Sequence, residues 1–348
     1  MSADYFHRLH AQTLTRFWVN NPSPAETGLA LAAGAINCTT NPAFCSKLLQ
    51  SDPTYLRGAI DEVVQETKDH DTAAALTYRR VAQDLLDAFR PLYDGSGGQC
   101  GFVTMQDDPR CDHDAEATIQ AALRNRWLGP NLMAKIPVIA GGIEAIEACV
   151  EANIPICATE IFAVAQAVDI CERYEAAARR TGNRPPFFVT HISGIFDEYL
   201  GKVARRQGIA IRPEVLDQAG CAIARKQYRL LRERGYPGIL LGGGARGIHH
   251  FTEMVGGAAH VTINWSTAEE IMRDGIEVAP RMDAETPPEV VAELCDTFAD
   301  FRRAYEEDGL SLPEYAGFGP VQLFRNAFLK GWYLLLAEVA SRRHAHAV

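Results

Sequence analysis

The chain has 348 residues, of which 47% are apolar and 22% are charged, and its formal net charge at pH 7 is -10. This composition excludes collagen-like and disordered chains, and a chain of this length buries a large core without needing disulfides or a structural metal. No run approaches the roughly 18 apolar residues of a membrane span, and the first residues lack the apolar core of a signal peptide. The negative charge argues against nucleic acid as a partner. We therefore expect a cytoplasmic protein that binds neither membrane nor nucleic acid.

The cysteines and histidines do not predict a metal or disulfide framework. The nine cysteines are an odd number and include no C-x-x-C pair, so reduced thiols are expected. The histidine groupings lack the spacing of a zinc site. These groupings are Cys111 with His113, His249 with His250, and His344 with His346. We expect no bound metal.

Short apolar runs alternate with amphipathic helical patterns along the chain. Several runs are apolar throughout, as expected for parallel strands that are covered on both faces. Eight runs are predicted to be strands: 17–20, 35–38, 102–106, 132–136, 155–159, 187–192, 239–241 and 261–263. Eight strands that alternate with helices predict an α/β fold, a closed (β/α)8 TIM barrel. An open doubly wound sheet is the alternative, but no G-x-G-x-x-G string follows the first strand.

Apolar residues at three- and four-residue spacing predict the connecting helices. These are 55–68, 73–89, 115–126, 143–152, 163–180, 213–234 and 251–255. Residues 1–15 are predicted to form a leading helix, and 288–307 and 321–343 are predicted to form two helices that cap one barrel end. No repeat or long linker divides the chain. We expect one domain over 1–348, with the barrel in 16–275 and the C-terminal helices in 276–348.

The active sites of such barrels lie where the strands end and lead into loops. Polar residues at the predicted strand ends are therefore the candidates for function. They are Asn20, Thr39, Thr40, Asn41, Gln106, Lys135, Thr159, Thr190, His191 and the turn from Gly242 to Arg246.

Lys135 is the most informative candidate. It is one of six lysines and the only one inside an apolar strand run, Leu-Met-Ala-Lys-Ile-Pro-Val-Ile. Burial disfavours the ammonium form, and lowering a lysine pKa from about 10.4 to about 7 costs roughly 4–5 kcal/mol. A neutral amine in a dry pocket attacks a carbonyl carbon and forms a Schiff base. A structural lysine paired with a carboxylate is the alternative.

Two polar strings at strand ends suggest ligand contacts. Asn37-Cys38-Thr39-Thr40-Asn41-Pro42 offers small polar side chains that either hold sugar hydroxyls or cap the next helix. Gly242-Gly243-Gly244-Ala245-Arg246 lets backbone N–H groups approach an anion, and its arginine adds a forked donor. This turn predicts a phosphate site, although glycine-rich turns also occur without ligands.

Taken together, these residues resemble the transaldolase family. Thr39-Thr40-Asn41-Pro42 matches the T-T-N-P string of that family. Lys135-Ile136-Pro137, followed by Gly142-Ile143-Glu144-Ala145-Ile146, matches its Schiff-base lysine strand and the helix after it. Thr159 with Ile161-Phe162 and Ala165-Gln166 is similar to the threonine strand, and Gly242 to Arg246 to the phosphate-binding turn. The resemblance runs in order from about Phe17 to Ile263.

The resemblance implies a transferase of carbohydrate metabolism, of the type found in the pentose phosphate pathway. Lys135 would attack a ketose to give an iminium, a C–C bond would break, and the dihydroxyacetone enamine would add to an acceptor aldehyde. Thr39, Asn41 and Thr159 would orient hydroxyls and a water that relays protons. Arg246 would hold a phosphate, and Thr190 and Gly244 complete the expected substrate site. No cofactor is implied, the partner is a small sugar or sugar phosphate, and a homodimer is compatible with this activity.

Three departures from the family pattern alter the expected proton transfer and phosphate binding. Asn20 stands where the family has an aspartate, and Gln106 stands where it has a glutamate, as in its fructose-6-phosphate aldolase branch. Ile195 stands where it has a second phosphate-binding arginine. Because an amide cannot shuttle protons, the acid–base machinery is altered, and each nearby ionisable group is either a replacement proton carrier or a structural residue. The candidates are Glu160 and His191, which lie beside matched positions, followed by Asp107 and Asp108.

Other functions are compatible with these departures. A specialised aldolase acting on an unusual or non-phosphorylated sugar fits them best. A non-catalytic sugar-binding barrel is the second alternative, but the retained buried Lys135 argues against it. A metal-dependent barrel hydrolase is disfavoured, because the predicted strand ends of this chain lack the histidine and carboxylate ligands that such an enzyme needs.

Overall fold

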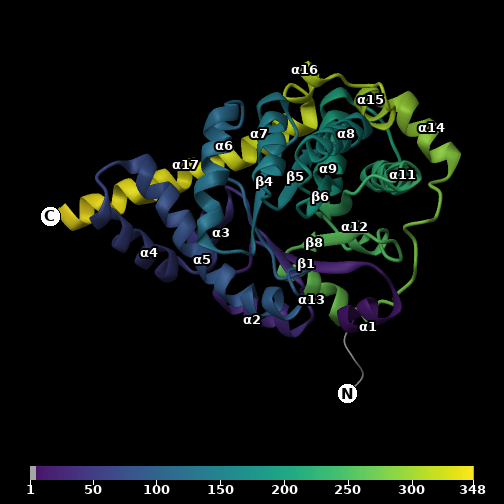
Figure 1. Ribbon diagram of the computed structural model, residues 1–348. Coiled ribbons are helices and arrows are strands. Elements are labelled where there is room, and N and C mark those ends of the chain that lie inside the picture. Colours follow the sequence, from purple (N-terminus) through teal and green to yellow (C-terminus); the bar gives the residue numbers. More distant parts are fainter. Residues whose placement is uncertain (1–4, 348) are drawn as a thin grey trace.

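The computed structural model describes residues 5–347 and contains eight parallel strands closed into a barrel (Figure 1). In chain order they are β1 (Arg16–Asn20), β2 (Asn37–Thr39), β3 (Val103–Met105), β4 (Leu132–Pro137), β5 (Ile156–Ile161), β6 (Phe187–Ile192), β7 (Ile239–Gly243) and β8 (His260–Ile263). Each strand pairs in parallel with the next, and β8 closes the barrel on β1, with His260 opposite Arg16. The predicted (β/α)8 barrel is confirmed.

All eight predicted strands are present, with bounds that differ by a few residues. β5 continues two residues beyond the predicted end at 159, so Glu160 lies within the strand rather than after it. β7 extends into the predicted glycine turn, where Gly243 pairs with Ile192 of β6.

Helices connect the strands and cover the outside of the barrel (Figure 1). They are α2 (Pro24–Ala32), α3 (Phe44–Ser51), α4 (Pro53–Glu66), α5 (His70–Gly95), α6 (Ala115–Asn125), α7 (Ala140–Glu151), α8 (Val164–Thr181), α9 (Ser193–Gln207), α10 (Pro213–Leu216), α11 (Ala219–Glu233), α12 (His249–Thr252) and α13 (Trp265–Arg273). Two 3-10 turns, η1 (Pro109–Cys111) and η2 (Arg126–Leu128), flank α6.

The helix predictions are correct in part. The segment predicted as one helix over 213–234 is divided into α10 and α11, and the segment over 288–307 is divided into α14 (Pro288–Thr297) and α15 (Ala299–Tyr305). Apolar spacing did not predict α2, α3, α9, α13 or α16 (Leu312–Tyr315). α2 begins at a capping box formed by Ser23 and Glu26, a local polar signal that apolar spacing does not contain.

The barrel interior consists of an apolar layer with a polar layer above it. The apolar layer is Trp18, Phe102, Met133, Cys157, Phe188 and Leu241. Because side chains alternate along a strand, the residue two positions later on each of these strands faces the same interior. Five of those residues are polar, Asn20, Thr104, Lys135, Thr159 and Thr190, and the sixth is Gly243. The fold therefore places a polar ring at the carboxyl ends of the strands, above a sealed apolar floor.

Helices from the two ends of the chain lie at opposite ends of the barrel. α17 (Gly319–Ala347) crosses the carboxyl ends of the strands, where Phe324 and Phe328 line the same cavity as Lys135 (yellow helix in Figure 1). α1 (Tyr5–Gln12) covers the other end, and its Phe6 ring stacks on Phe17 at 4.0 Å. Residues 1–4 of the predicted leading helix lie outside the described part. None of the helices in that part combines the length and apolar character that a bilayer crossing requires.

Candidate active site

Lys135 lies on β4 within the polar ring, and 6% of its surface is exposed. Its ammonium nitrogen, Nζ, donates a hydrogen bond to the backbone oxygen of Thr40 at 3.2 Å, so its closest partner is a neutral carbonyl rather than a carboxylate. Burial lowers the pKa of Lys135, and the nearby Cys157 and Glu160 oppose that shift. This environment favours the neutral, nucleophilic amine.

A cavity of about 320 Å³ opens in front of Lys135 at the mouth of the barrel. Strand ends, the turn after β7 and α17 enclose it. Seven of the residues predicted from the sequence line it: Lys135, Asn20, Thr39, Asn41, Thr190, Gly244 and Arg246. The structure therefore brings the predicted nucleophile and the predicted substrate-binding residues to one cavity.

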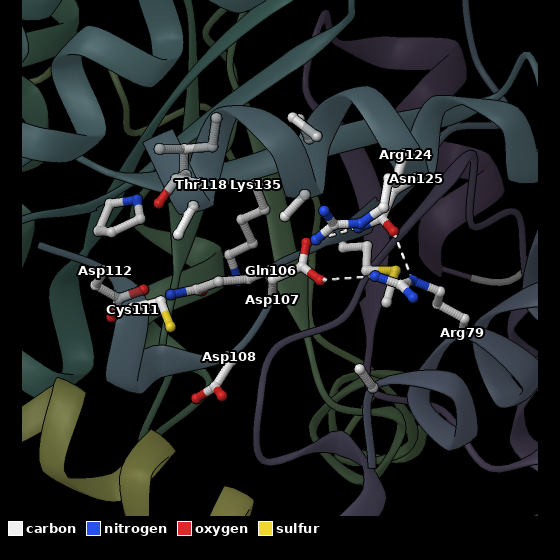
Figure 2. Close-up of a pocket in the computed structure, with 18 of the residues that line it drawn as sticks. Arg79, Gln106, Asp107, Asp108, Cys111, Asp112, Thr118, Arg124, Asn125 and Lys135 are labelled. Carbon is white, nitrogen blue, oxygen red and sulfur yellow. Dashed lines mark hydrogen bonds and ion pairs between the residues drawn. The ribbon is translucent and has the colours of Figure 1, made fainter. Parts of the chain in front are cut away.

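A second cavity of about 450 Å³ reaches Lys135 from the side of β3 and α6 (Figure 2). Its far wall holds Asp107, which accepts a hydrogen bond from Asn125 at 2.6 Å and lies 3.8 Å from Arg79. Burial raises the pKa of Asp107, and Arg79 opposes this change. Gln106 lines this second cavity beside Lys135. Lys135 thus lies between two cavities.

Hydrogen bonds hold the polar side chains of β1, β2 and β8 in place. Asn20 donates to Oδ1 of Asn264 at 2.9 Å, and Thr39 donates to Oδ1 of Asn20 at 2.9 Å. The Thr39 hydroxyl also lies 2.6 Å from that of Thr262. Asn41 accepts the backbone N–H of Ala43 at 3.0 Å. These amides and hydroxyls form a fixed polar wall suited to sugar hydroxyls.

Glu160 is held at the site by an irregularity in β5. Its backbone φ is +57°, and the pairing of β5 with β6 shifts register between Ala158 and Ile161. Left-handed backbone is costly for a residue with a side chain and is concentrated at functional sites. Oε1 of Glu160 accepts a hydrogen bond from the Gln106 amide at 3.0 Å. Burial raises the pKa of Glu160 to about 7, although Gln106 and Lys135 oppose the shift.

Several buried polar atoms around Lys135 have unused hydrogen-bonding capacity. Thr159 Oγ1, Gln106 Oε1 and Asp112 Oδ2 have no hydrogen-bond partner among the described residues. Buried polar atoms are normally paired, so groups left open in this way indicate a place where a substrate or water completes them. Thr159, predicted as catalytic, is among them.

Sequence reasoning missed two charged residues at this site. Asp112 follows η1 and is 5% exposed, and Arg325 projects from α17 with its Nε 3.7 Å from Asp112 Oδ2. Arg325 also donates to the backbone oxygen of Pro109 at 3.0 Å. No local motif marks either residue, because their meeting depends on α17 crossing the barrel.

His191 is not brought to the cavity. Thr190 faces the barrel interior, so strand alternation turns His191 outward. Its Nε2 lies 2.9 Å from the backbone oxygen of Gly220, and burial lowers its pKa to about 4. Thr190 instead contacts Cys157 Sγ at 3.1 Å inside the barrel. Asp108, another proton-transfer candidate, is paired with Arg110.

The turn after β7 requires glycine and carries a paired arginine. Gly244 has a φ of +67°, and a Cβ there would lie 2.5 Å from Cγ2 of Ile192 and 3.0 Å from Cγ1 of Ile195. Ile195 is thus packed under the turn, where the family resemblance expects a second arginine. Arg246 forms an ion pair with Glu198, Nε to Oε2, at 2.7 Å.

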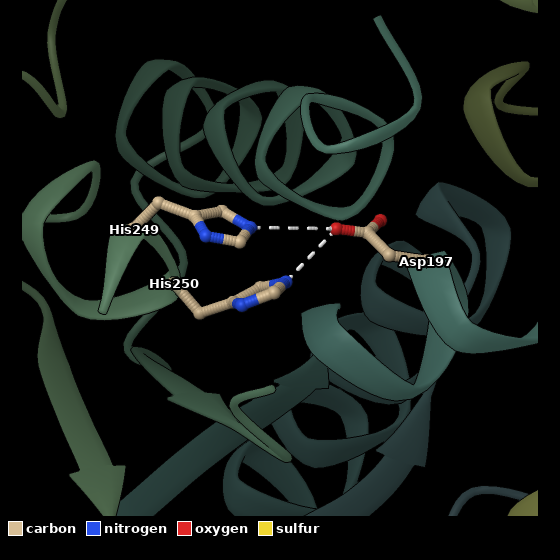
Figure 3. A group of neighbouring side chains, drawn as sticks. All are labelled: Asp197, His249 and His250. Carbon is tan, nitrogen blue, oxygen red and sulfur yellow. Dashed lines mark hydrogen bonds and ion pairs between the residues drawn. The ribbon is translucent and has the colours of Figure 1, made fainter. Parts of the chain in front are cut away.

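Among the described residues, one group of three potential metal-ligating side chains lies close enough together to hold a metal ion. It consists of Asp197, His249 and His250 (Figure 3). His250 Nδ1 accepts the backbone N–H of Arg246 at 3.3 Å, so its proton is on Nε2, which donates to Asp197 Oδ2 at 2.9 Å. Asp197 also accepts from the backbone of Gly220 at 2.7 Å. These hydrogen bonds connect α9 and α12 to the turn that carries Arg246.

Comparison with known proteins identifies the family of this chain. A family model described as transaldolase/fructose-6-phosphate aldolase matches residues 29–309. A transaldolase of Mycobacterium tuberculosis strain H37Rv is 30% identical over 211 residues, which are 57% of this chain and 55% of that protein. Transaldolase 1 of Streptomyces avermitilis is 29% identical over 57% of this chain and 54% of its own length. The matched stretch thus spans about half the length of these relatives. The chain belongs to the transaldolase/fructose-6-phosphate aldolase family.

Proposed function

We propose that the chain is a Schiff-base transferase that moves a dihydroxyacetone unit from a ketose, or ketose phosphate, to an aldehyde acceptor. The observation that carries this proposal is the buried amine of Lys135, bonded to a carbonyl and facing a cavity of about 320 Å³. Family membership and the name transaldolase borne by its relatives support the same chemistry.

The neutral Lys135 nitrogen attacks the ketone carbon and forms a carbinolamine. Protonation of the carbinolamine hydroxyl releases water and leaves an iminium on Lys135. The iminium withdraws electrons from the neighbouring C–C bond. A base then removes the proton of the donor's hydroxyl, the bond breaks, and the first aldehyde leaves. The remaining enamine adds to the acceptor aldehyde, and water hydrolyses the product from Lys135.

Glu160 is the proton carrier in this proposal. Asn20 and Gln106 occupy the positions where the family resemblance expects carboxylates, and an amide side chain does not act as a general acid or base near neutral pH. Glu160 is buried, bonded to Gln106 and has a pKa of about 7, which allows it to donate and accept protons near neutrality. Thr159, whose hydroxyl has no partner among the described residues, orients the water that relays them.

The donor is a sugar whose hydroxyls contact Thr39, Asn41 and Thr190. Arg246 is the phosphate anchor, but it shares its guanidinium with Glu198, and Ile195 supplies no second charge. One shared cation binds a phosphate more weakly than two free ones. These features favour an unusual or non-phosphorylated sugar over the ordinary sugar phosphate.

The test is three-carbon transfer to the four-carbon aldehyde erythrose from fructose and from fructose 6-phosphate, followed by mass spectrometry of the seven-carbon ketose that forms. Wild type is expected to transfer from at least one of these donors, and Lys135→Met is expected to abolish transfer. Lys330→Met, which alters an exposed lysine of α17, is the matched control and is expected to behave as wild type. Retained transfer in Lys135→Met would remove Schiff-base catalysis from the proposal.

A further inference from the structure

The cavity in front of Lys135 has two walls of opposite character. Its polar wall comes from β1, β2 and β8, whose amides and hydroxyls bond to one another. The other wall has four apolar residues, one at the end of β6 and three on α17. They are Ile192, Phe324, Ala327 and Phe328, and we call them the apolar wall. Because β2 and β6 lie across the closed barrel from each other, Ile192 faces the polar wall.

The aromatic rings of the apolar wall are packed in fixed positions. The centroids of the Phe324 and Phe328 rings are 4.2 Å apart, and Phe162 meets Phe324 edge-on at 6.2 Å. Phe162 and Phe328 are buried, whereas Phe324 is partly exposed. A ligand that binds to rings already held by packing orders few side chains and so loses little entropy. The apolar wall is therefore preorganised for a ligand with apolar surface.

α17 is held across the barrel mouth by a contact on each side of Ala327. On one side, Arg325 donates a hydrogen bond to the backbone oxygen of Pro109 at 3.0 Å. On the other, Gly331 packs on Ala43 at the start of α3, where an added Cβ would lie 2.7 Å from Ala43 Cα. Figure 1 shows α17 in yellow. These contacts make α17 a fixed roof, so its rings stay above whatever binds in the cavity.

The cations that line the cavity are not free to bind a phosphate. Arg246 Nε lies 2.7 Å from Glu198 Oε2, and Lys47 Nζ lies 3.3 Å from Glu26 Oε2. Burial lowers the pKa of the third cation, Lys135, and favours its neutral form. A phosphate would compete with a carboxylate for either of the paired cations. An uncharged ligand disturbs neither ion pair.

We propose that the apolar wall binds the aldehyde half of the substrate, and that the acceptor is an aldehyde with a hydrocarbon body (alkyl, deoxy or aryl) rather than a sugar phosphate. This inference rests on the proposed function, in which a three-carbon unit stays bonded to Lys135. The hydroxyls of that unit bond to the polar wall. The new C–C bond forms one carbon further from Lys135, so the aldehyde lies higher in the cavity, towards α17.

The apolar wall distinguishes acceptors by their hydroxyl groups. Phenylalanine and isoleucine side chains offer no hydrogen bond, so a hydroxyl held against them loses its bonds to water without replacement. A methylene group in the same place gains free energy by leaving water. Removing the Phe324 ring abolishes that gain, whereas a positive charge at Ala327 supplies a partner for phosphate. The two changes should therefore alter the acceptor preference in different ways.

The experiment compares three four-carbon acceptors, butanal, erythrose and erythrose 4-phosphate, with fructose or fructose 6-phosphate as the donor. For each acceptor, kcat/KM of a variant is divided by the wild-type value, so that differences in free aldehyde content cancel. Phe324→Ser is expected to lower the value for butanal about tenfold and that for erythrose less than about twofold. Phe324→Leu keeps an apolar side chain and is expected to retain most of the butanal activity. Tyr333→Ala, on the exposed side of α17, is the matched control and is expected to change none of the three values.

Ala327→Lys tests the same wall without removing a buried side chain. Ala327 is exposed to solvent and lines the cavity, so a longer side chain can be accommodated there. The introduced ammonium is expected to raise kcat/KM for erythrose 4-phosphate about tenfold and to lower that for butanal. Ala337→Lys, at an exposed position of α17 outside the cavity, is the matched control.

The results separate this inference from the proposed function. Borohydride reduction with the donor tests for an adduct at Lys135, and its absence in wild type would overturn the proposed function. An adduct at Lys135 in a wild type that transfers nothing to butanal would overturn the apolar wall alone. Equal losses for butanal and erythrose in Phe324→Ser, or an unchanged acceptor preference in Ala327→Lys, would do the same. Circular dichroism checks that both variants fold, and if Phe324→Ser does not, Ala327→Lys decides.

Discussion

The Gln106 side-chain amide donates a hydrogen bond to Oε1 of Glu160 at 3.0 Å, and both residues are buried. A neutral amide bonded to a carboxyl group orients it without adding a charge. Gln106 therefore fixes the position of Glu160 Oε1 without pairing the carboxyl group with a cation. This relationship links the carboxyl ends of β3 and β5, and Gln106 stands where the family resemblance expects a glutamate.

Replacing Glu160 by Gln is expected to lower kcat by about 100-fold or more, because general acid–base catalysis contributes about that much. The substitution removes the titrating carboxyl group, whose pKa is about 7, so the limb of the pH–rate profile near pH 7 is expected to disappear. Steady-state kinetics between pH 5 and pH 9 check this. Glu151→Gln, an exposed change on α7, serves as the control. An unchanged profile in Glu160→Gln would assign proton transfer to another group.

The same substitution is expected to make the protein more stable at alkaline pH. The pKa of Glu160 rises from its ordinary 4.5 to about 7 on folding, so the native state binds more protons than the unfolded state in that window. The free energy of unfolding of the wild-type protein should therefore fall by about 3 kcal/mol as the pH rises from about 5 to about 7, and it should stay at the lower value above pH 7. Glu160→Gln removes this loss. Urea unfolding at pH 5 and pH 8 measures the difference, and equal changes at both pH values would contradict it.

Gly244→Ala is expected to destabilise the fold by about 1–3 kcal/mol, because left-handed backbone strains alanine and its Cβ meets Ile192 at 2.5 Å. Gly182→Ala is the matched control, since Gly182 has a φ of +78° and no atom within 4 Å of an added Cβ. The difference between the two variants in urea unfolding isolates the contact with Ile192. Equal losses would mean that the turn relaxes around the methyl group.

Arg246→Ala is expected to raise the KM for fructose 6-phosphate about tenfold or more and to change that for fructose little, because a charge-assisted bond to phosphate is lost. Arg179→Ala, on the exposed face of α8, controls for the loss of one positive charge. Steady-state kinetics with both donors provide the comparison. If both donors are affected equally, Arg246 is a structural partner of Glu198 rather than a phosphate anchor.

Sequence patterns predicted most of the barrel because parallel strands buried on both faces leave continuous apolar runs. β4, β5 and β6 are buried at every position, and all three were predicted. α3 and α13 were missed because they are only 8 and 9 residues long and offer few turns of apolar spacing. Helix breaks, such as that at Phe298 between α14 and α15, depend on tertiary packing.

The site was predictable where one strand end fixes one side chain. Lys135, Asn20, Thr39 and Thr190 follow from strand ends and alternation. The same alternation excludes His191 once Thr190 faces inward. Glu160 escapes this rule because its left-handed backbone breaks the alternation next to Thr159, and no sequence pattern predicts that for a glutamate.

Asp112 and Arg325 were not predictable from local sequence. Their contact requires η1 and α17, which are far apart in the chain, to meet over the barrel mouth. Only the position of α17 across the carboxyl ends of the strands brings the arginine to the carboxyl group. Charged residues that act in pairs from distant elements carry no shared signal in the sequence.

Every step of the proposed transfer depends on a covalent imine between Lys135 and a ketose. The most direct measurement is borohydride reduction in the presence of fructose or fructose 6-phosphate, followed by peptide mass mapping. We expect a reduced sugar adduct on the peptide that contains Lys135, and on no other lysine peptide at comparable yield. Turnover of these donors without an adduct at Lys135 would contradict it.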